Sequence, residues 1–170
     1  GYEKSNLVQM SMQGDMPKNF EVIKQELLNT GLISNVSSCD EIMYTGNNSS
    51  NYTWDGKDPG SDILISHRMV SDGFMATLGL PVIEGRDFTS VADSSNAVIS
   101  ESLAKLMGPG SALGKKIDGG GYVHTVVGVV KDFVYGDVYT KGEPVIFFCL
   151  PQQSDKIYVR AKTGTHPEEL

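Results

Sequence analysis

Residues 69–89, MVSDGFMATLGLPVIEGRDFT, contain the signals that decide the local fold at the centre of this chain. An alternating strand pattern over residues 62–70 ends inside this stretch. Ser71 can then cap a short apolar helix, and Gly79 can end that helix in the left-handed conformation. A short extended piece and a turn over residues 85–88 follow. A strand, a helix and a turn in this order indicate a domain that mixes α and β structure.

The GRDF turn invites a functional interpretation, because an Arg–Asp pair stands between Gly and Phe. A structural interpretation explains it better. Gly85 permits a tight backbone path. Arg86 and Asp87 can satisfy loop carbonyls and amides, while Phe88 packs inward. Residues 131–133, KDF, end a valine-rich strand and receive the same interpretation.

Hydrophobic periodicity predicts the remaining elements. It indicates a β-α-β unit at the N-terminus, a second short helix capped by Ser100, a β-hairpin around three glycines, and two later strands. The expected ranges are strand 7–12, a helix opened by Pro17 and ended by Gly31, strand 33–44, strand 97–99, hairpin strands 115–118 and 122–132, and strands 145–150 and 157–161.

These elements predict an α+β fold of two lobes. Residues 1–81 and 141–170 would form a discontinuous lobe that contains the βαβ unit. Residues 82–140 would form an inserted, β-rich lobe. The N-terminal unit and the strands at 145–162 would share one sheet, although they are far apart in the sequence.

Composition limits the function classes. A chain of 170 residues can bury roughly 70% of its unfolded surface without support from a disulfide or a metal. The formal net charge of −7 argues against a nucleic-acid surface, because phosphate binding needs clustered Lys and Arg. The longest apolar run, residues 145–150, is far shorter than the roughly 20 residues that span a bilayer.

Both ends suggest a piece of a longer protein. No signal-peptide pattern opens the chain. Residues 166–169, HPEE, are typical of a helix start, with Pro at the first position and acidic side chains in the first turn. We therefore expect an excised fragment.

The segment over residues 108–116, GPGSALGKK, resembles a phosphate-binding loop only superficially. Five residues separate Gly108 from Gly114, whereas the motif requires four, and Lys116 stands where a Mg²⁺-binding hydroxyl should be. The segment also follows a predicted helix instead of a strand. A loop between a helix and a strand explains it, so we expect no nucleotide and no other cofactor.

The sequence shows no set of residues typical of a metal site or a hydrolytic site. His67 and His124 fall on apolar strand faces, which favours partly buried, hydrogen-bonded rings over metal ligands, and His166 stands apart from both. No metal motif, nucleophile elbow or distinguishable carboxylate pair occurs. We therefore expect no catalytic, cofactor-binding or metal-binding residue.

Cys39 and Cys149 are too few for a disulfide framework. Cys39 lies in a polar, strand-like stretch and Cys149 in a strongly apolar strand. Buried thiols are the favoured interpretation, with a mutual disulfide left open, so the cysteines do not fix the redox compartment.

Four segments carry a family resemblance. Residues 70–88, 97–100, 113–117 and 126–133 read VSDGFMATLGLPVIEGRDF, AVIS, LGKKI and VVGVVKDF. In this order and approximate spacing they resemble the MacB-like periplasmic core domain of FtsX- and MacB-family ABC transporter permeases, especially those of Bacteroidota-type bacteria. The resemblance is best over residues 52–163.

The resemblance implies a non-catalytic periplasmic domain whose discontinuous lobe is porter-like and which transmits motion to and from flanking transmembrane helices. It further implies a second permease copy, a separate or fused cytoplasmic ATPase that supplies energy, and a periplasmic adaptor or substrate. The location implied is the periplasmic face of the bacterial inner membrane. The family's motifs are architectural, so no catalytic residue is carried over. The isolated fragment is expected to be monomeric.

Two other classes stay open. An extracellular module that binds glycans would show an exposed stripe containing Trp54, Tyr52 and Tyr44. A small hydrolase would show a cleft with a paired His and carboxylate.

We expect no deep ligand pocket, because no convergent polar cluster is visible. The sequence names neither the transported substrate nor the periplasmic partner, nor the number of such domains in the full-length chain.

Overall fold

The strands of the computed structural model form one sheet, and the residues it describes are 6–40, 48–133 and 143–165. The strands are β1 (Leu7–Ser11), β2 (Ile33–Cys39), β3 (Ser49–Asn51), β4 (Thr53–Trp54), β5 (Leu64–Val70), β6 (Val82–Gly85), β7 (Asn96–Ser100), β8 (Lys116–Asp118), β9 (Val123–Val130), β10 (Val145–Cys149) and β11 (Lys156–Ala161). The helices are α1 (Phe20–Asn29), α2 (Phe74–Leu78) and α3 (Glu101–Leu106), with short 3₁₀ turns η1 (Pro17–Asn19), η2 (Val91–Ser95) and η3 (Pro151–Gln153). The predicted mixture of α and β structure is confirmed.

The order of strands places the two ends of the described chain side by side. The sheet runs β1-β11-β2-β5-β10-β7-β9-β8-β4, with β3 added on β5 and β6 on β9. β11 lies between β1 and β2, so the N-terminal unit and the last strand share one sheet as predicted. The N–H of Ala161 donates to the carbonyl of Asn6 at 2.8 Å. The described ends therefore leave from the same end of the β1–β11 pair.

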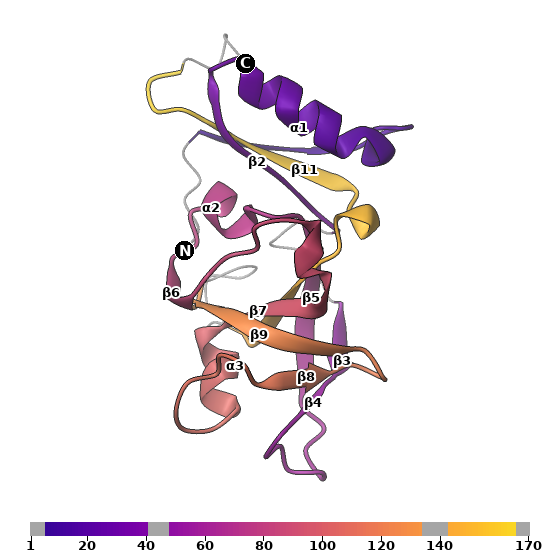
Figure 1. Cartoon of the computed structure of the whole chain (residues 1–170), viewed down its shortest axis with the longest axis vertical. Coiled ribbons are helices and arrows are strands. Elements are labelled where there is room, and N and C mark those ends of the chain that lie inside the picture. The colour runs from indigo at the N-terminus through magenta and orange to yellow at the C-terminus, as the bar shows by residue number, and fades with distance from the viewer. Residues whose placement is uncertain (1–5, 41–47, 134–142, 166–170) are drawn as a thin grey trace.

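Helix α1 covers one face of β1, β11 and β2, and α2 lies against the other face (Figure 1). The alternation along β11 shows why both faces are apolar. Ile157 and Val159 pack toward α1, whereas Tyr158 between them packs against Phe74 of α2. We call β1, β2, β11 and α1 together the α1 unit.

Strand β10 lies between β5 and β7, so it joins the half of the sheet that contains the α1 unit to the remaining strands. It pairs in parallel with β5 and antiparallel with β7, and all five of its residues are buried. Val145, Phe147 and Cys149 belong to one core cluster, and Ile146 and Phe148 belong to another. Burial on both faces explains the continuous apolar run at this position of the sequence.

The predicted lobe boundaries near residues 82 and 140 stay a prediction. Hydrogen bonds run across them, because β10 pairs with β7 and β4 pairs with β8. The α1 unit is joined to β5 by a single pair of the ladder, Cys39 opposite Val70. Few ladder hydrogen bonds therefore connect the α1 unit to the rest of the sheet, and they lie between β2 and β5.

Local signals were confirmed in most places. Ser100 accepts a hydrogen bond from the Leu103 N–H at 3.4 Å and caps α3, and Gly79 ends α2 with φ of +66°. The predicted cap at Ser71 was wrong, because α2 begins after Gly73, whose φ is +70°. Strand 33–44 ends at Cys39 in the described part, and residues 41–47 lie outside it. Within the described ranges no helix is long and apolar enough to cross a bilayer.

Two glycines allow β6 and β9 to approach each other closely. Gly85 has φ of +73°, and a Cβ there would overlap the carbonyl oxygen of Val127. A Cβ on Gly128 would overlap the carbonyl oxygen of Arg86, and the N–H of Arg86 in turn donates to Val127 at 3.0 Å. The nearest atom at each glycine is a backbone oxygen, which cannot move aside as a flexible side chain could.

We predict that Gly128→Ala lowers the free energy of unfolding by about 1–3 kcal/mol, because overpacking against fixed backbone forces the strands apart. Urea unfolding followed by Trp54 fluorescence measures the change. Gly60→Ala is the matched control, since a Cβ on Gly60 would make only an ordinary contact of 3.5 Å with Asp58. The control should change stability by no more than about 0.5 kcal/mol. Equal losses in the two variants would contradict the close approach of β6 and β9.

Candidate functional site at the α2 junction

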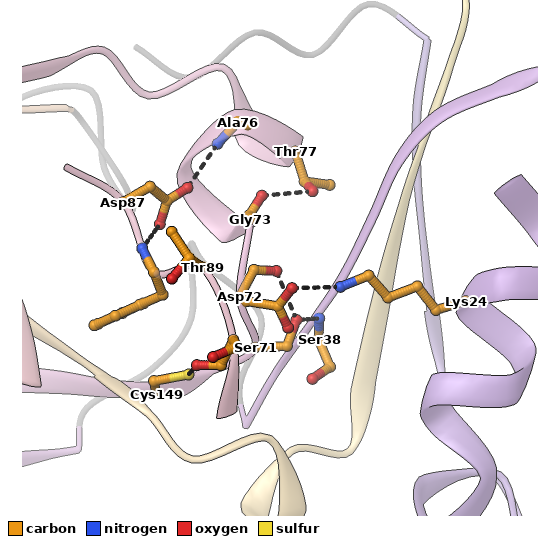
Figure 2. A network of polar contacts seen from close by, with 12 residues as sticks. Lys24, Ser38, Ser71, Asp72, Gly73, Ala76, Thr77, Asp87, Thr89 and Cys149 are labelled. Carbon is orange, nitrogen blue, oxygen red and sulfur yellow. Dashed lines mark hydrogen bonds and ion pairs between the residues drawn. The ribbon is translucent and has the colours of Figure 1, made fainter. Parts of the chain in front are cut away.

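A network of polar contacts surrounds α2, where the α1 unit meets the rest of the sheet (Figure 2). We call this region the α2 junction. It consists of α2 itself and Lys24, Ser38, Ser71, Asp72 and Arg160. The residues come from four segments that are far apart in the sequence, so the fold alone brings them together.

Lys24 of α1 forms a partly buried ion pair with Asp72, which lies in the turn before α2. Lys24 Nζ lies 2.8 Å from Asp72 Oδ2, and the two side chains are 11% and 23% exposed. Water and salt screen such a pair less than a pair on the surface. The pair therefore ties α1 to the turn between β5 and α2 across 48 positions of sequence.

Ser38 and Ser71 close the narrow connection between β2 and β5. The N–H of Ser38 donates to the Ser71 hydroxyl oxygen at 3.0 Å, and the N–H of Ser71 donates to the Ser38 carbonyl at the same distance. The Ser71 hydroxyl is thus used between strands and is not free to cap α2. It reinforces the ladder directly beside the single pair formed by Cys39 and Val70.

Arg160 connects β11 to the C-terminal half of α2. Its Nε donates to the Thr77 carbonyl at 2.5 Å, and the Thr77 hydroxyl donates to the Gly73 carbonyl at 2.9 Å. A cation near the last carbonyls of a helix satisfies acceptors that have no partner within the helix. Lys24 and Arg160 thus hold the two ends of the α2 region to the α1 unit.

Asp87 supplies the N-terminal cap of α2 that the sequence assigned to Ser71. Its Oδ2 accepts from the N–H groups of Met75 at 3.1 Å and Ala76 at 3.3 Å, and its Oδ1 accepts from Phe88 at 2.7 Å. Burial raises the pKa of Asp87, while these three N–H groups oppose the rise by favouring the carboxylate. The GRDF turn is therefore a remote helix cap.

Asp132 performs the same task for α3. Its Oδ1 accepts from the Ser102 N–H at 2.8 Å, and the following Phe133 is buried. Phe133 and Phe88 pack into the same core cluster around Phe147. The structural interpretation of both Asp-Phe segments is confirmed, because each places a carboxylate on a helix start and an aromatic ring in one shared core.

Arg86 and Asp93 form a two-pronged ion pair beside this core. Arg86 Nη1 and Nη2 lie 3.0 and 2.7 Å from the two Asp93 oxygens, and Thr89 and Asn96 also donate to Asp93. The Arg86 guanidinium holds the pKa of Asp93 well below its usual range, helped by the N–H of Thr89. The pair fixes η2 against the turn after β6.

The loop that resembles a phosphate-binding motif has the wrong surroundings for phosphate. It follows α3 and borders a cavity of about 440 Å³ whose lining includes Glu84 and Glu101. The Lys115 ammonium is used within the fold, since its Nζ donates to the Met107 carbonyl at 3.0 Å. Lys105 also lines this cavity but is paired with Glu101 at 2.7 Å, which leaves the Glu84 carboxylate to repel a phosphate anion. The interpretation of this segment as a structural loop agrees with this geometry.

His67 and His124 are half-buried, as predicted. The His124 ring lies 4.4 Å from the Phe148 ring between centroids, and burial lowers the pKa of His124. Among the described residues no three His, Cys, Asp or Glu side chains gather to hold a metal ion. His166 lies outside the described residues.

The exposed aromatic stripe expected of a glycan-binding module is not present at its two described positions. Tyr52 is 6% exposed and Trp54 is 9% exposed, because both belong to a core cluster. Lys57 covers the Trp54 ring, with its Nζ 5.0 Å from the ring centroid. Tyr44 lies outside the described residues.

Cys39 and Cys149 are free thiols in this structure and do not form a disulfide. They lie opposite Val70 on its two sides, one on β2 and the other on β10. Two strand spacings place their Cα atoms about 9–10 Å apart, beyond the reach of a disulfide. Burial raises the pKa of Cys149 to about 12, so this thiol is unreactive.

Sequence reasoning missed the contacts that define the α2 junction. Lys24 and Arg160 reach partners 48 and 83 positions away, and no local pattern marks them. One signal was available. A lysine near the apolar face of α1, and an arginine within the apolar β11, indicate charges that need partners when they are partly buried.

Comparisons with known proteins agree with this architecture. The family model described as "MacB-like periplasmic core domain" matches residues 2–170. A comparison with curated protein sequences found no match. At identities of 20% or less, the solved structures below share the fold and support no finer conclusion.

The periplasmic region of MacB from Actinobacillus actinomycetemcomitans has 15% identity and a TM-score of 0.65, covering 97% of this chain and 78% of that one. A domain of a putative permease from Porphyromonas gingivalis has 20% identity and a TM-score of 0.58, covering 86% and 62%. The extracellular domain of the noncanonic ABC-type transporter YknZ from Gram-positive bacteria has 19% identity and a TM-score of 0.58, covering 94% and 85%.

We predict that Lys24 and Asp72 are energetically coupled. A double-mutant cycle with Lys24→Met and Asp72→Asn, measured by urea unfolding, should give a coupling energy of about 1–2 kcal/mol, since the pair is partly buried. The control cycle uses Lys18 and Asp15, which are 3.0 Å apart but 81% and 76% exposed, and should give less than about 1 kcal/mol. Coupling no larger than in the control would show that the α2 junction is not held by this pair.

We also predict an acid-dependent loss of stability at Asp93. Its pKa is lower in the folded than in the unfolded chain, so its contribution is complete above the unfolded value of about 4 and is lost as the pH falls below it. Asp93→Asn should therefore weaken the chain at pH 7 and flatten the pH dependence of unfolding below about pH 5. Thermal unfolding from pH 7 to 2 measures both effects. A variant with an unchanged acid slope would contradict the pairing with Arg86.

Proposed function

Since this chain belongs to the family of MacB-like periplasmic core domains of ABC transporter permeases, we propose that it transmits conformational change and catalyses no reaction. In this proposal the motion passes between the membrane and ATPase on one side and a periplasmic substrate or partner on the other. A separate or fused cytoplasmic ATPase supplies the energy. The domain lies at the periplasmic face of the bacterial inner membrane and needs no cofactor.

The observation that carries this proposal is the path from the described chain ends to the body of the sheet. Asn6 and Ala161 are hydrogen-bonded to each other, so segments that continue from both would move the β1–β11 pair together. From there the α1 unit contacts the rest through the Lys24–Asp72 pair and the Arg160–Thr77 bond. A displacement at the ends is thereby passed on without separating the strands.

The partners follow from the same proposal. A second permease copy stands opposite this domain in the transporter, and a periplasmic adaptor or substrate meets its distal surface. The isolated 170-residue chain is expected to be monomeric at micromolar concentration, because in the transporter the membrane helices supply the effective concentration for contact. The acidic net charge of −7 argues against nucleic acid as a partner.

The two alternative functions find less support. A glycan module lacks the exposed stripe at Tyr52 and Trp54, which are buried. A hydrolase requires a His and a carboxylate in one cleft. The cavity that His124 borders has no carboxylate among its lining residues, and the cavity beside α3 has two glutamates and no histidine.

We predict that the domain changes its distance from the second copy during transport. Val22 lies on α1 and is 62% exposed, so a spin label on Val22→Cys in both copies of the full-length transporter reports the separation of the two α1 helices. The distance distribution measured by pulsed electron resonance should shift between the ATP-bound and nucleotide-free states. The native Cys39 and Cys149 are fully buried and should remain unlabelled.

The control separates rigid-body motion from internal motion. Labels on Val22→Cys and Leu64→Cys within a single labelled copy report the distance between α1 and β5, and Leu64 is 63% exposed. This internal distance should stay constant while the distance between copies changes. If the inter-copy distance is the same in both nucleotide states while transport proceeds, the domain is not a moving part.

A further inference from the structure

The sequence predicted no deep ligand pocket, but the structure has a cavity outside the α2 junction that the proposed transmission of motion does not explain. Its volume is about 540 Å³, which lies within the range of pockets for small organic molecules. The lining comes from β5, β9, β10, η2, η3, the turn between β8 and β9, and the connection between β3 and β4. The residues are Tyr52, Met69, Ser94, Gly119, Tyr122, His124, Phe148, Leu150 and Gln153.

The inner wall of the cavity is aromatic and rigid. Phe148 of the buried strand β10 lies with its ring centroid 4.4 Å from His124 and 5.9 Å from Tyr52. Gly119 lies flat against the Tyr52 ring, because a Cβ on Gly119 would come within 2.6 Å of that ring. The wall therefore has its shape fixed by packing before any ligand enters.

The rim is polar but carries no full charge at neutral pH. Ser94 and Gln153 are exposed and offer a hydroxyl and an amide. Burial lowers the pKa of His124, so its imidazole is neutral, and backbone groups of Tyr122 and Ser94 hold the ring in place. Tyr122 is 76% exposed and leaves an aromatic face open to the solvent at the mouth.

We propose that this cavity binds an uncharged small molecule that carries an aromatic group. Aromatic rings pack favourably edge-on or offset against the rings of Tyr122, His124 and Phe148. A charged group would lose its hydration inside a cavity whose lining offers no opposite charge. A lone aromatic side chain of a peptide would fill only part of the space, so the proposal commits to a small molecule.

The test uses N-phenyl-1-naphthylamine, an uncharged aromatic dye whose fluorescence increases in apolar sites, with the 170-residue chain. The dye should bind saturably with one site per chain. Ser94→Trp should weaken binding at least tenfold by filling the cavity, and Tyr122→Ala should weaken it roughly three- to tenfold by removing one ring. Both positions are exposed, so thermal unfolding should confirm that the variants fold.

Matched controls decide whether binding is located in the cavity. Val22→Trp adds the same ring on exposed α1, and Leu64→Ala removes an exposed apolar side chain on β5; neither should change binding. The sulfonated analogue 8-anilino-1-naphthalenesulfonate has the same ring skeleton with a negative charge and should bind at least tenfold more weakly. Non-saturable binding, equal effects of the control and cavity variants, or tighter binding of the sulfonate would each overturn the proposal.

Discussion

Strand β10 hydrogen-bonds to β5 along one edge and to β7 along the other, and side chains cover both of its faces. Its pairing is parallel along one edge and antiparallel along the other, and its alternating residues divide between two core clusters. Phe147 packs against Phe74 of α2 on one side, and Phe148 forms the wall of the aromatic cavity on the other. The position of α2 and the shape of the cavity thus depend on the register of one strand.

Two Asp-Phe segments position the short helices α2 and α3 on the sheet. Both follow strands that pair with each other, β6 and β9, and both send a carboxylate to a helix that precedes them in the chain. A short helix of five or six residues is marginal alone, since its first N–H groups lack partners. Caps supplied by Asp87 and Asp132 therefore make the positions of α2 and α3 depend on the β6–β9 pair. Both Asp-Phe segments, which belong to the family's motifs, thus have an architectural role in this chain.

Sequence reasoning predicted the elements well because their signals are local. Alternation marked β5, and a helical cap marked α3 at Ser100. It failed where a local rule was satisfied by a distant group. Ser71 has the right chemistry for a cap, but its hydroxyl accepts from Ser38 of another strand, and Asp87 caps α2 from the far side of a turn.

The polar contacts of the α2 junction and the aromatic cavity were outside the reach of pattern reasoning. Lys24 and Asp72 are brought together by the pairing of β2 with β5. The cavity was not predicted from the sequence for a similar reason, since its wall combines Tyr52, His124 and Phe148 from three separate segments. No window of sequence contains such a set. In the sequence, these sites were indicated only by single polar residues within otherwise apolar patterns.

The antiparallel pairing of β1 and β11 also determines how the domain responds to force. Asn6 and Ala161 lie at the same end of the pair, so a pull that separates the two ends loads the hydrogen bonds one after another, as in opening a zip fastener. Forces directed along both strands in the same sense put little load on the bonds between them and are passed on as shear to the β11–β2 pairs. The α1 unit is thus mechanically strong when its two ends travel together and weak when they are drawn apart. Transport cycles that spread these ends would peel β1 from the sheet before they moved anything beyond it.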